Sequence, residues 1–245
     1  MNAADVIRES VTEVQRLRQE SRAVPWIGEA VTHLKRLQGR RFAGTYADLL
    51  NSRQYEAGAR FFLDELYGDR DYAERDAQFA KIATAIEKLF PRDVAATAAA
   101  LARLHALTES LDHAMARAAR LSGPDDAGNY VVAWKEVGRP ADRQLQLDSV
   151  IALGAELARL TRVPGLRLML RMMRGPASAA GLDSLQRFLE SGFDTFAAIA
   201  KLRGGAEAFL DTIRKREQHL IDFLFAGDAA VCEAEVRRIL GDAAA

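Results

Sequence analysis

Cysteine is nearly absent from this 245-residue chain, and charge of one sign is absent altogether. The lone Cys232 has no intrachain partner, so the sequence excludes the disulfide framework of a small secreted domain and any zinc site that needs two thiolates. The 34 basic and 34 acidic residues give a formal net charge of zero. This balance removes a global attraction to nucleic acid or to anionic membranes, so we expect neither as a partner.

Long hydrophobic runs are also missing. No stretch reaches the roughly 20 apolar residues that a membrane-spanning helix needs, so we expect no transmembrane segment. Residues 1–20 alternate acids and bases and contain no apolar run of signal-peptide length. Together with the single cysteine, these absences predict a soluble, cytoplasmic, bacterial-type protein.

The chain is rich in residues that favour helices. Windows of Ala, Leu, Arg and Glu carry apolar residues at steps of three and four, the period of an amphipathic helix. We predict an all-α fold, at least about two-thirds helical, built as a single multi-helix bundle domain of roughly nine or ten helices over residues 1–245. An alternative places residues 1–45 in a peripheral N-terminal helical arm. The apolar stripes predict a core that includes Phe62, Leu66, Phe79, Ile82, Ile86, Leu104, Leu111, Phe188, Phe196 and Phe223.

Two stretches carry a family resemblance. FFLDELYGDRDYAERDAQFAKI (Phe61–Ile82) and LMLRMMRGPASAAGLDSLQRFLESGFDTF (Leu168–Phe196) resemble an uncharacterised bacterial family, a domain of unknown function whose members are all helical. The resemblance extends over most of the chain, from about Tyr55 to Gly227. It implies a helical, bacterial protein and supplies no catalytic residues.

The histidines are the first candidates for chemistry. On helical wheels, His113 and His219 lie far from the apolar stripes of their helices, so we expect both in solvent. His105 lies at the edge of its stripe, with Glu109 and Asp112 following at i+4 and i+7 on the same flank. An imidazole beside two carboxylates can transfer protons near neutral pH, although a boundary histidine satisfied by one carboxylate is the favoured interpretation. No HExxH motif and no second histidine within a turn occur, so we predict neither a metal site nor a cofactor.

Arg75 is a second candidate. Its wheel position lies among apolar residues such as Phe79, where a guanidinium must find acceptors or remain a buried unpaired charge. The carboxylates of Glu65, Asp76 and Asp112 are candidate partners. A structural ion pair is favoured, and an arginine that binds an anionic ligand is the alternative that the sequence leaves open.

The segment RGPASAAG (Arg174–Gly181) is a third candidate. Arg174 and the backbone donors of the following helix could bind an anion, but a tight turn between helices is favoured because Pro176 removes one donor. Just before it, residues 166–174 predict a short amphipathic helix with a basic face, which could contact an acidic partner. A solvated basic face balanced by nearby acids is the favoured interpretation.

No motif of a nucleophile elbow, a P-loop or a dinucleotide fingerprint occurs. The leading hypothesis is therefore a non-enzymatic helical module that binds a protein partner or assembles with itself as a homo-oligomer, most simply a dimer. The alternative is a bundle that holds a small apolar or tetrapyrrole-type ligand near His105 or Arg75. An enzyme is the third and least supported possibility.

Overall fold

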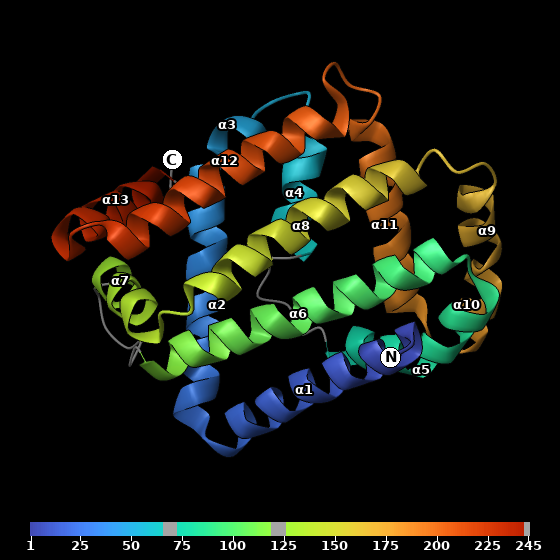
Figure 1. Cartoon of the computed structure of the whole chain (residues 1–245), viewed down its shortest axis with the longest axis horizontal. Coiled ribbons are helices and arrows are strands. Elements are labelled where there is room, and N and C mark those ends of the chain that lie inside the picture. The colour runs from blue at the N-terminus through green and yellow to red at the C-terminus, as the bar shows by residue number, and fades with distance from the viewer. Residues whose placement is uncertain (66–72, 119–125, 243–245) are drawn as a thin grey trace. The chain divides into compact units, whose positions relative to one another are not determined.

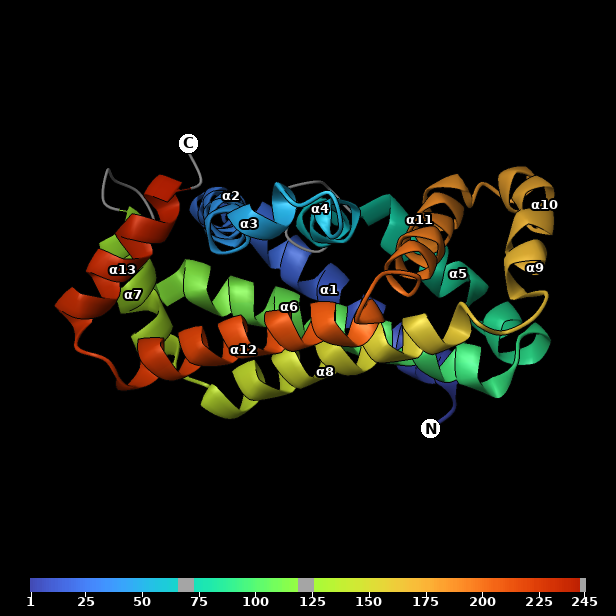
Figure 2. The same ribbon diagram turned by 90° about the horizontal axis from the view of Figure 1, so that it is seen from above.

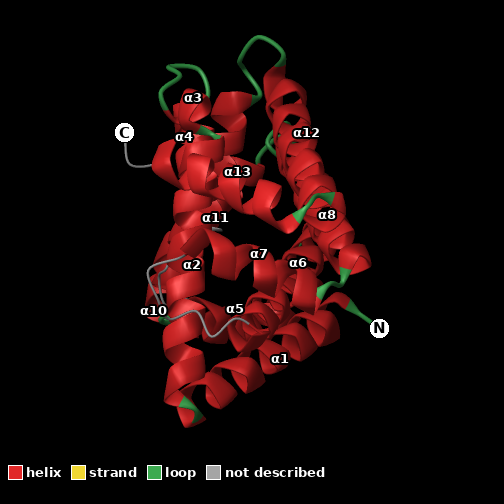
Figure 3. Cartoon of the chain, turned by 90° about the vertical axis from the view of Figure 1, so that its left-hand side faces the viewer, coloured by secondary structure: helices red, strands yellow, loops and turns green. Residues whose placement is uncertain are grey.

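The computed structural model describes residues 1–65, 73–118 and 126–242, and within these ranges it contains helices and turns but no β-strand (Figure 3). The prediction of an all-α fold is confirmed, with 87% of the structure helical. None of the helices in these ranges is both long and apolar enough to cross a bilayer.

The helices follow one another along the chain with short connections (Figure 1). Pro25 occupies the first turn of α2, where its missing N–H has no helical acceptor to lose. The one-turn α3 and the six-residue α10 were not predicted, since segments so short show no apolar period. The bounds are α1 Ala3–Ala23, α2 Pro25–Thr45, α3 Ala47–Leu50, α4 Glu56–Glu65, α5 Ala73–Leu89, α6 Arg92–Ala118, α7 Asp126–Val137, α8 Pro140–Leu160, α9 Leu166–Met172, α10 Arg174–Ala179, α11 Asp183–Ile199, α12 Gly205–Ala226 and α13 Ala229–Asp242.

The chain divides into two compact units. The first unit comprises residues 1–15, 70–106 and 149–211, and the second comprises residues 16–69, 107–148 and 212–245. Helices α1, α6, α8 and α12 each contribute residues to both units. The single domain over residues 1–245, and the peripheral arm over residues 1–45, stay predictions.

The first unit has an apolar core made by α1, α5, α6 and α11. Ile7, Val11, Phe79 and Ile86 are among its buried members. Helices α9, α10 and α11 pack side by side next to it (Figure 2). A smaller cluster around Phe193 joins α8, α9 and α11. These contacts bury the stripes that the three-and-four spacing predicts.

In the second unit, α13 packs against both α7 and α2, and α3 and α4 also pack against α2 (Figure 1). Leu34, Phe42, Tyr46 and Tyr130 are fully buried in this unit. The unit also buries several charged side chains, which is unusual for a helical core. The candidate site described below lies among them.

Most of the predicted core is buried. Phe62, Phe79, Ile86, Leu104, Leu111 and Phe196 are buried, and Ile82, Phe188 and Phe223 are half-buried. Leu66 lies outside the described residues. The nine described residues therefore lie on core-facing sides of their helices, and three of them are less deeply buried than predicted.

Replacing Phe79 by alanine tests this core. Phe79 is buried among α1, α5, α6 and α11 residues, so we expect Phe79→Ala to lower the free energy of unfolding by about 3–5 kcal/mol through lost burial and an unfilled cavity. Urea denaturation followed by circular dichroism measures the change. Ala77→Ser, an exposed position on the same helix, is the control and should change stability by less than about 0.7 kcal/mol. A Phe79→Ala midpoint equal to that of Ala77→Ser would show that the face assignment is wrong.

Candidate functional site

A pocket of about 600 Å³ lies within the second unit. The last turns of α1, the C-terminal third of α6, the end of α7 and the turn that precedes α8 form its walls. Three arginines and two glutamates line it, together with one histidine and one serine. The lining residues are Arg16, Leu17, Glu20, Ser110, His113, Ala114, Arg117, Ala118, Glu136, Val137 and Arg139.

His113 is the most unusual side chain of this lining. It is only 6% exposed, and its Nε2 atom has no hydrogen-bond partner. The nearby carboxylate oxygen Oε2 of Glu20 is 3.9 Å away, beyond hydrogen-bond length. Burial lowers the pKa of His113, Glu20 raises it, and Arg117 and Arg16 lower it further. The imidazole is therefore neutral near pH 7, and Nε2 either donates or accepts a hydrogen bond according to its tautomer.

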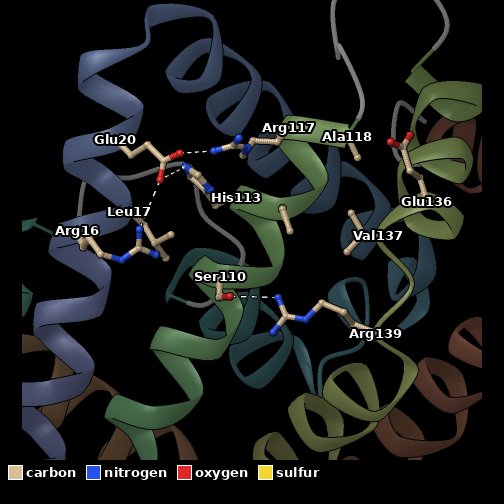
Figure 4. A pocket seen from close by; sticks show the side chains of 11 residues that line it. Arg16, Leu17, Glu20, Ser110, His113, Arg117, Ala118, Glu136, Val137 and Arg139 are labelled. Carbon is tan, nitrogen blue, oxygen red and sulfur yellow. Dashed lines mark hydrogen bonds and ion pairs between the residues drawn. The ribbon is translucent and has the colours of Figure 1, made fainter.

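Glu20 lies at the centre of the polar groups on one side of the pocket. Its carboxylate accepts a hydrogen bond from the guanidinium of Arg117 and a long one, 3.5 Å, from that of Arg16. Figure 4 shows the Glu20 side chain between Arg16, His113 and Arg117, and it shows Ser110 with Arg139 as a second polar group. The pocket thus has one carboxylate surrounded by two guanidinium groups and an imidazole.

Arg139 lines the other side of the pocket, and its backbone conformation is strained. Its φ angle is 58°, and it is the one non-glycine residue with positive φ in the described part of the chain. Such a conformation costs an L-residue roughly 1–3 kcal/mol. Nη1 of Arg139 donates to Ser110 Oγ at 3.1 Å, and Nε donates to Asp142 at 2.6 Å. The turn therefore holds a guanidinium at the pocket at the expense of backbone strain.

The expectation that His113 lies in solvent is wrong. The wheel located the apolar stripe of α6 correctly, since Leu111 and Met115 are fully buried. However, α6 is also covered on its polar sides, where α1 supplies Glu20 to Arg117 and α2 supplies polar partners. A stripe analysis finds only the apolar side of a helix, so it missed the pocket. His219 is exposed, as predicted.

The two carboxylates predicted on the flank of α6 are buried and bonded to α2. Lys35 Nζ lies 2.5 Å from Glu109 Oε1, and Gln38 Nε2 donates to Asp112 Oδ1 at 2.9 Å. Burial raises the pKa of Asp112, an effect that Lys35 partly offsets and Glu109 reinforces. Asp112 is therefore a carboxylate whose ionised form is unfavourable in the folded protein.

His105 belongs to the first unit and bonds to a different helix. Its Nε2 lies 2.9 Å from Oδ2 of Asp76 on α5, and the ring is half-buried. The partners of His105, Glu109 and Asp112 thus come from two helices, α5 and α2. This arrangement is the one expected of a boundary histidine satisfied by a carboxylate.

An Asp112→Asn substitution tests the unfavourable ionisation. The asparagine Oδ1 still accepts the hydrogen bond from Gln38, while the buried charge is removed. The folded-state pKa of Asp112 is raised, so the stability lost through this group grows as the pH rises above its unfolded pKa, about 3.9, and is complete above its folded-state pKa. We expect Asp112→Asn to be more stable than the wild type at about pH 8 and the difference to close as the pH falls toward about 4. A variant less stable than the wild type at every pH in urea titrations would contradict this account.

The two remaining predicted site residues are arginines of the first unit. The guanidinium carbon of Arg75 lies 4.4 Å from the centre of the Phe188 ring, a cation–π contact. Pairing of Arg75 with a carboxylate stays a prediction, and of its candidate partners the Glu65 side chain lies outside the described atoms. Arg174 is exposed, and its Nε donates to Glu190 Oε1 at 2.7 Å. The hydrogen bonds of Arg174, with a further one from Gln186 and the positive charge of Arg174, lower the pKa of Glu190 to about 2.

The turn expected over Arg174–Gly181 is partly helix. Residues 174–179 form α10, which follows α9 directly. Pro176 is tolerated because it is the third residue of this helix, where the N–H groups lack helical acceptors. Among the residues that the structure describes, no cluster of three or more His, Cys, Asp or Glu side chains could hold a metal ion.

Comparison with protein-family models places the chain beside a family without an established role. The model of a family described as a domain of unknown function, DUF8198, matches residues 17–231. No curated protein and no solved structure matches the chain. The matched range includes both stretches that carry the resemblance found in the sequence, and every pocket residue except Arg16.

Proposed function

The chain belongs to the DUF8198 family, a domain of unknown function, and we propose that it is a non-enzymatic binding module whose pocket in the second unit holds a small polar ligand. The observation that carries this proposal is the buried Nε2 atom of His113, which has no hydrogen-bond partner at the wall of a pocket. A buried polar atom without a partner costs roughly 1–3 kcal/mol, and a ligand that completes its hydrogen bond recovers this energy.

Binding is better supported than catalysis. A histidine that acts as a general base for a nucleophile is hydrogen-bonded to a hydroxyl or a thiol, whereas His113 Nε2 has no such bond. Ser110, the hydroxyl in the pocket, is instead bonded to Arg139. The alternative ligand sites near His105 and Arg75 have less support, because those side chains are already engaged by Asp76 and Phe188.

Native mass spectrometry and a thermal-shift screen test the proposal. The full chain is purified from cells, its mass is compared before and after denaturing extraction, and it is then screened against small polar metabolites. We expect at least one compound to bind the wild type and not His113→Phe, which removes both ring nitrogens. His219→Phe, at an exposed position on α12, is the matched control and should bind normally. A wild-type protein that carries and binds no compound, or one whose ligands bind His113→Phe equally well, would refute the proposal.

The cellular location and the oligomeric state predicted from the sequence are part of the same proposal. We propose a cytoplasmic location, consistent with the free and buried Cys232, and self-association into a dimer. Light scattering at micromolar concentration tests the assembly. A monomer at all concentrations would remove self-association and leave the ligand-binding proposal unaffected.

A further inference from the structure

We infer that the ligand of this pocket carries an oxyanion, a carboxylate or a phosphate, and that this group binds by taking the place of the Glu20 carboxylate. The inference rests on the proposed function, because it names the chemistry of the ligand for the same pocket. It concerns the side of the pocket formed by Arg16, Glu20, His113 and Arg117.

The position of Glu20 is already an oxyanion site. Guanidinium groups of Arg117 and Arg16 both donate to its carboxylate, and His113 Nε2 faces it at 3.9 Å. Guanidinium groups match the planar geometry of carboxylates and the oxygens of phosphates, and they bind both with charge-assisted hydrogen bonds. The chain therefore holds one of its own carboxylates where an anionic ligand would be bound.

Glu20 leaves one of these groups without a hydrogen bond. Its carboxylate bonds to Arg117 and Arg16 but does not reach His113 Nε2. In α1 the Glu20 carboxylate bonds to the two guanidinium groups but not to His113, whereas a free oxyanion can take a position between all three groups. The bond to His113 requires the tautomer that carries its proton on Nε2. A ligand that displaces Glu20 gains the hydrogen bond to His113 that Glu20 leaves unmade.

Displacement of Glu20 is feasible. Its side chain is 30% exposed, so it already reaches solvent and can rotate outward without entering the core. Oε2 of Glu20 lies 3.9 Å from the shielded Nε2 of His113, so its displacement frees space beside that atom. Glu20 is thus an internal competitor that a ligand must outcompete, and it sets a threshold for which anions bind.

Arg139 and Ser110 provide a second anchor. They line the same pocket as a separate polar pair, and hydrogen bonds to Ser110 and Asp142 keep the Arg139 guanidinium in place. A ligand with two acidic or polar groups can therefore contact both sides of the pocket. This favours a small molecule with more than one oxyanion group over a simple inorganic anion.

Isothermal titration calorimetry on the full chain tests the inference, with citrate and inorganic phosphate as the two probes. We expect Glu20→Gln to bind at least one probe about tenfold or more tightly than the wild type, because the competing carboxylate and its attraction to the arginines are removed. Arg117→Gln should lose binding of that probe. Asp148→Asn is the matched control, since it removes an exposed carboxylate paired with Arg214 in the same unit and changes the net charge equally.

Each outcome has a defined meaning. If Glu20→Gln binds only citrate more tightly than the wild type does, the ligand class is carboxylates. If it binds only phosphate more tightly, the ligand class is phosphates. If Glu20→Gln binds neither probe more tightly than Asp148→Asn does, the inference is wrong. Should a ligand from the metabolite screen still require His113 in that case, the pocket remains a binding site and only the oxyanion exchange is refuted. Circular dichroism melting of each variant checks that the fold is retained.

Discussion

Arg41→Ala is expected to lower the free energy of unfolding by about 3–5 kcal/mol, because it leaves a poorly exposed carboxylate without its partner. Arg41 is 5% exposed, and its Nη1 lies 2.6 Å from Oε1 of Glu217, a carboxylate that is itself 12% exposed. The hydroxyl of the buried Tyr46 donates to the same oxygen at 2.9 Å. Removing the guanidinium leaves the Glu217 charge poorly solvated, and that penalty adds to the lost packing.

A second substitution separates the two contributions. In Arg41→Met combined with Glu217→Gln, the unpaired charge is gone and Tyr46 still has an acceptor, so we expect much of the lost stability to return. Urea denaturation at neutral pH measures both variants. Arg214→Ala, which breaks an exposed pair with Asp148 in the same unit, is the control and should cost roughly 1 kcal/mol or less. An Arg41→Ala loss no larger than that of Arg214→Ala would show that the pair is not effectively buried.

Gly44→Ala is the second substitution with a large expected effect. A Cβ atom added at Gly44 on α2 would lie 2.0 Å from the backbone oxygen of Ile239 on α13, a distance that no relaxation of a side chain can relieve. The two helices must move apart, and we expect a loss of about 3 kcal/mol or more from this overpacking. This loss outweighs the gain of roughly 1 kcal/mol that alanine normally brings to a helix interior.

Gly241→Ala is the matched control for Gly44→Ala. Gly241 lies in α13 itself, and an added Cβ there meets no atom within 4 Å. We expect this variant to be as stable as the wild type or more stable by up to about 1 kcal/mol. Thermal denaturation compares the two glycines. Equal melting temperatures for Gly44→Ala and Gly241→Ala would show that α13 does not pack on α2 as closely as the structure indicates.

The fold could largely be predicted from the sequence because its cause is local. Apolar residues at helical spacing, such as Leu104 and Leu111 on α6, must face a core, and both do. Pro25 likewise marks the start of α2 by its own geometry. Helices as short as α3 and α10 were missed because one or two turns contain too few positions to show a period.

The candidate site could not be predicted in the same way, because its residues meet only through tertiary structure. Glu20 and Arg117 are 97 residues apart in the sequence, and nothing in either local segment indicates that they pair. His113 was assigned to solvent because a wheel measures distance from the apolar stripe and carries no information about polar faces that other helices cover. The burial of Glu109 and Asp112 against α2 escaped the sequence analysis for the same reason.

The central claim is that the pocket binds its ligand through His113, and nitrogen-15 NMR of the histidine rings tests it most directly. The chain has four histidines, and the His113→Phe spectrum assigns the His113 resonances by their absence. On titration of the wild type with the ligand identified by the metabolite screen, or with citrate, we expect the Nε2 resonance of His113 to shift with saturation while the rings of His33, His105 and His219 stay unchanged. Binding that leaves the His113 ring resonances where they are in the free protein would contradict the account.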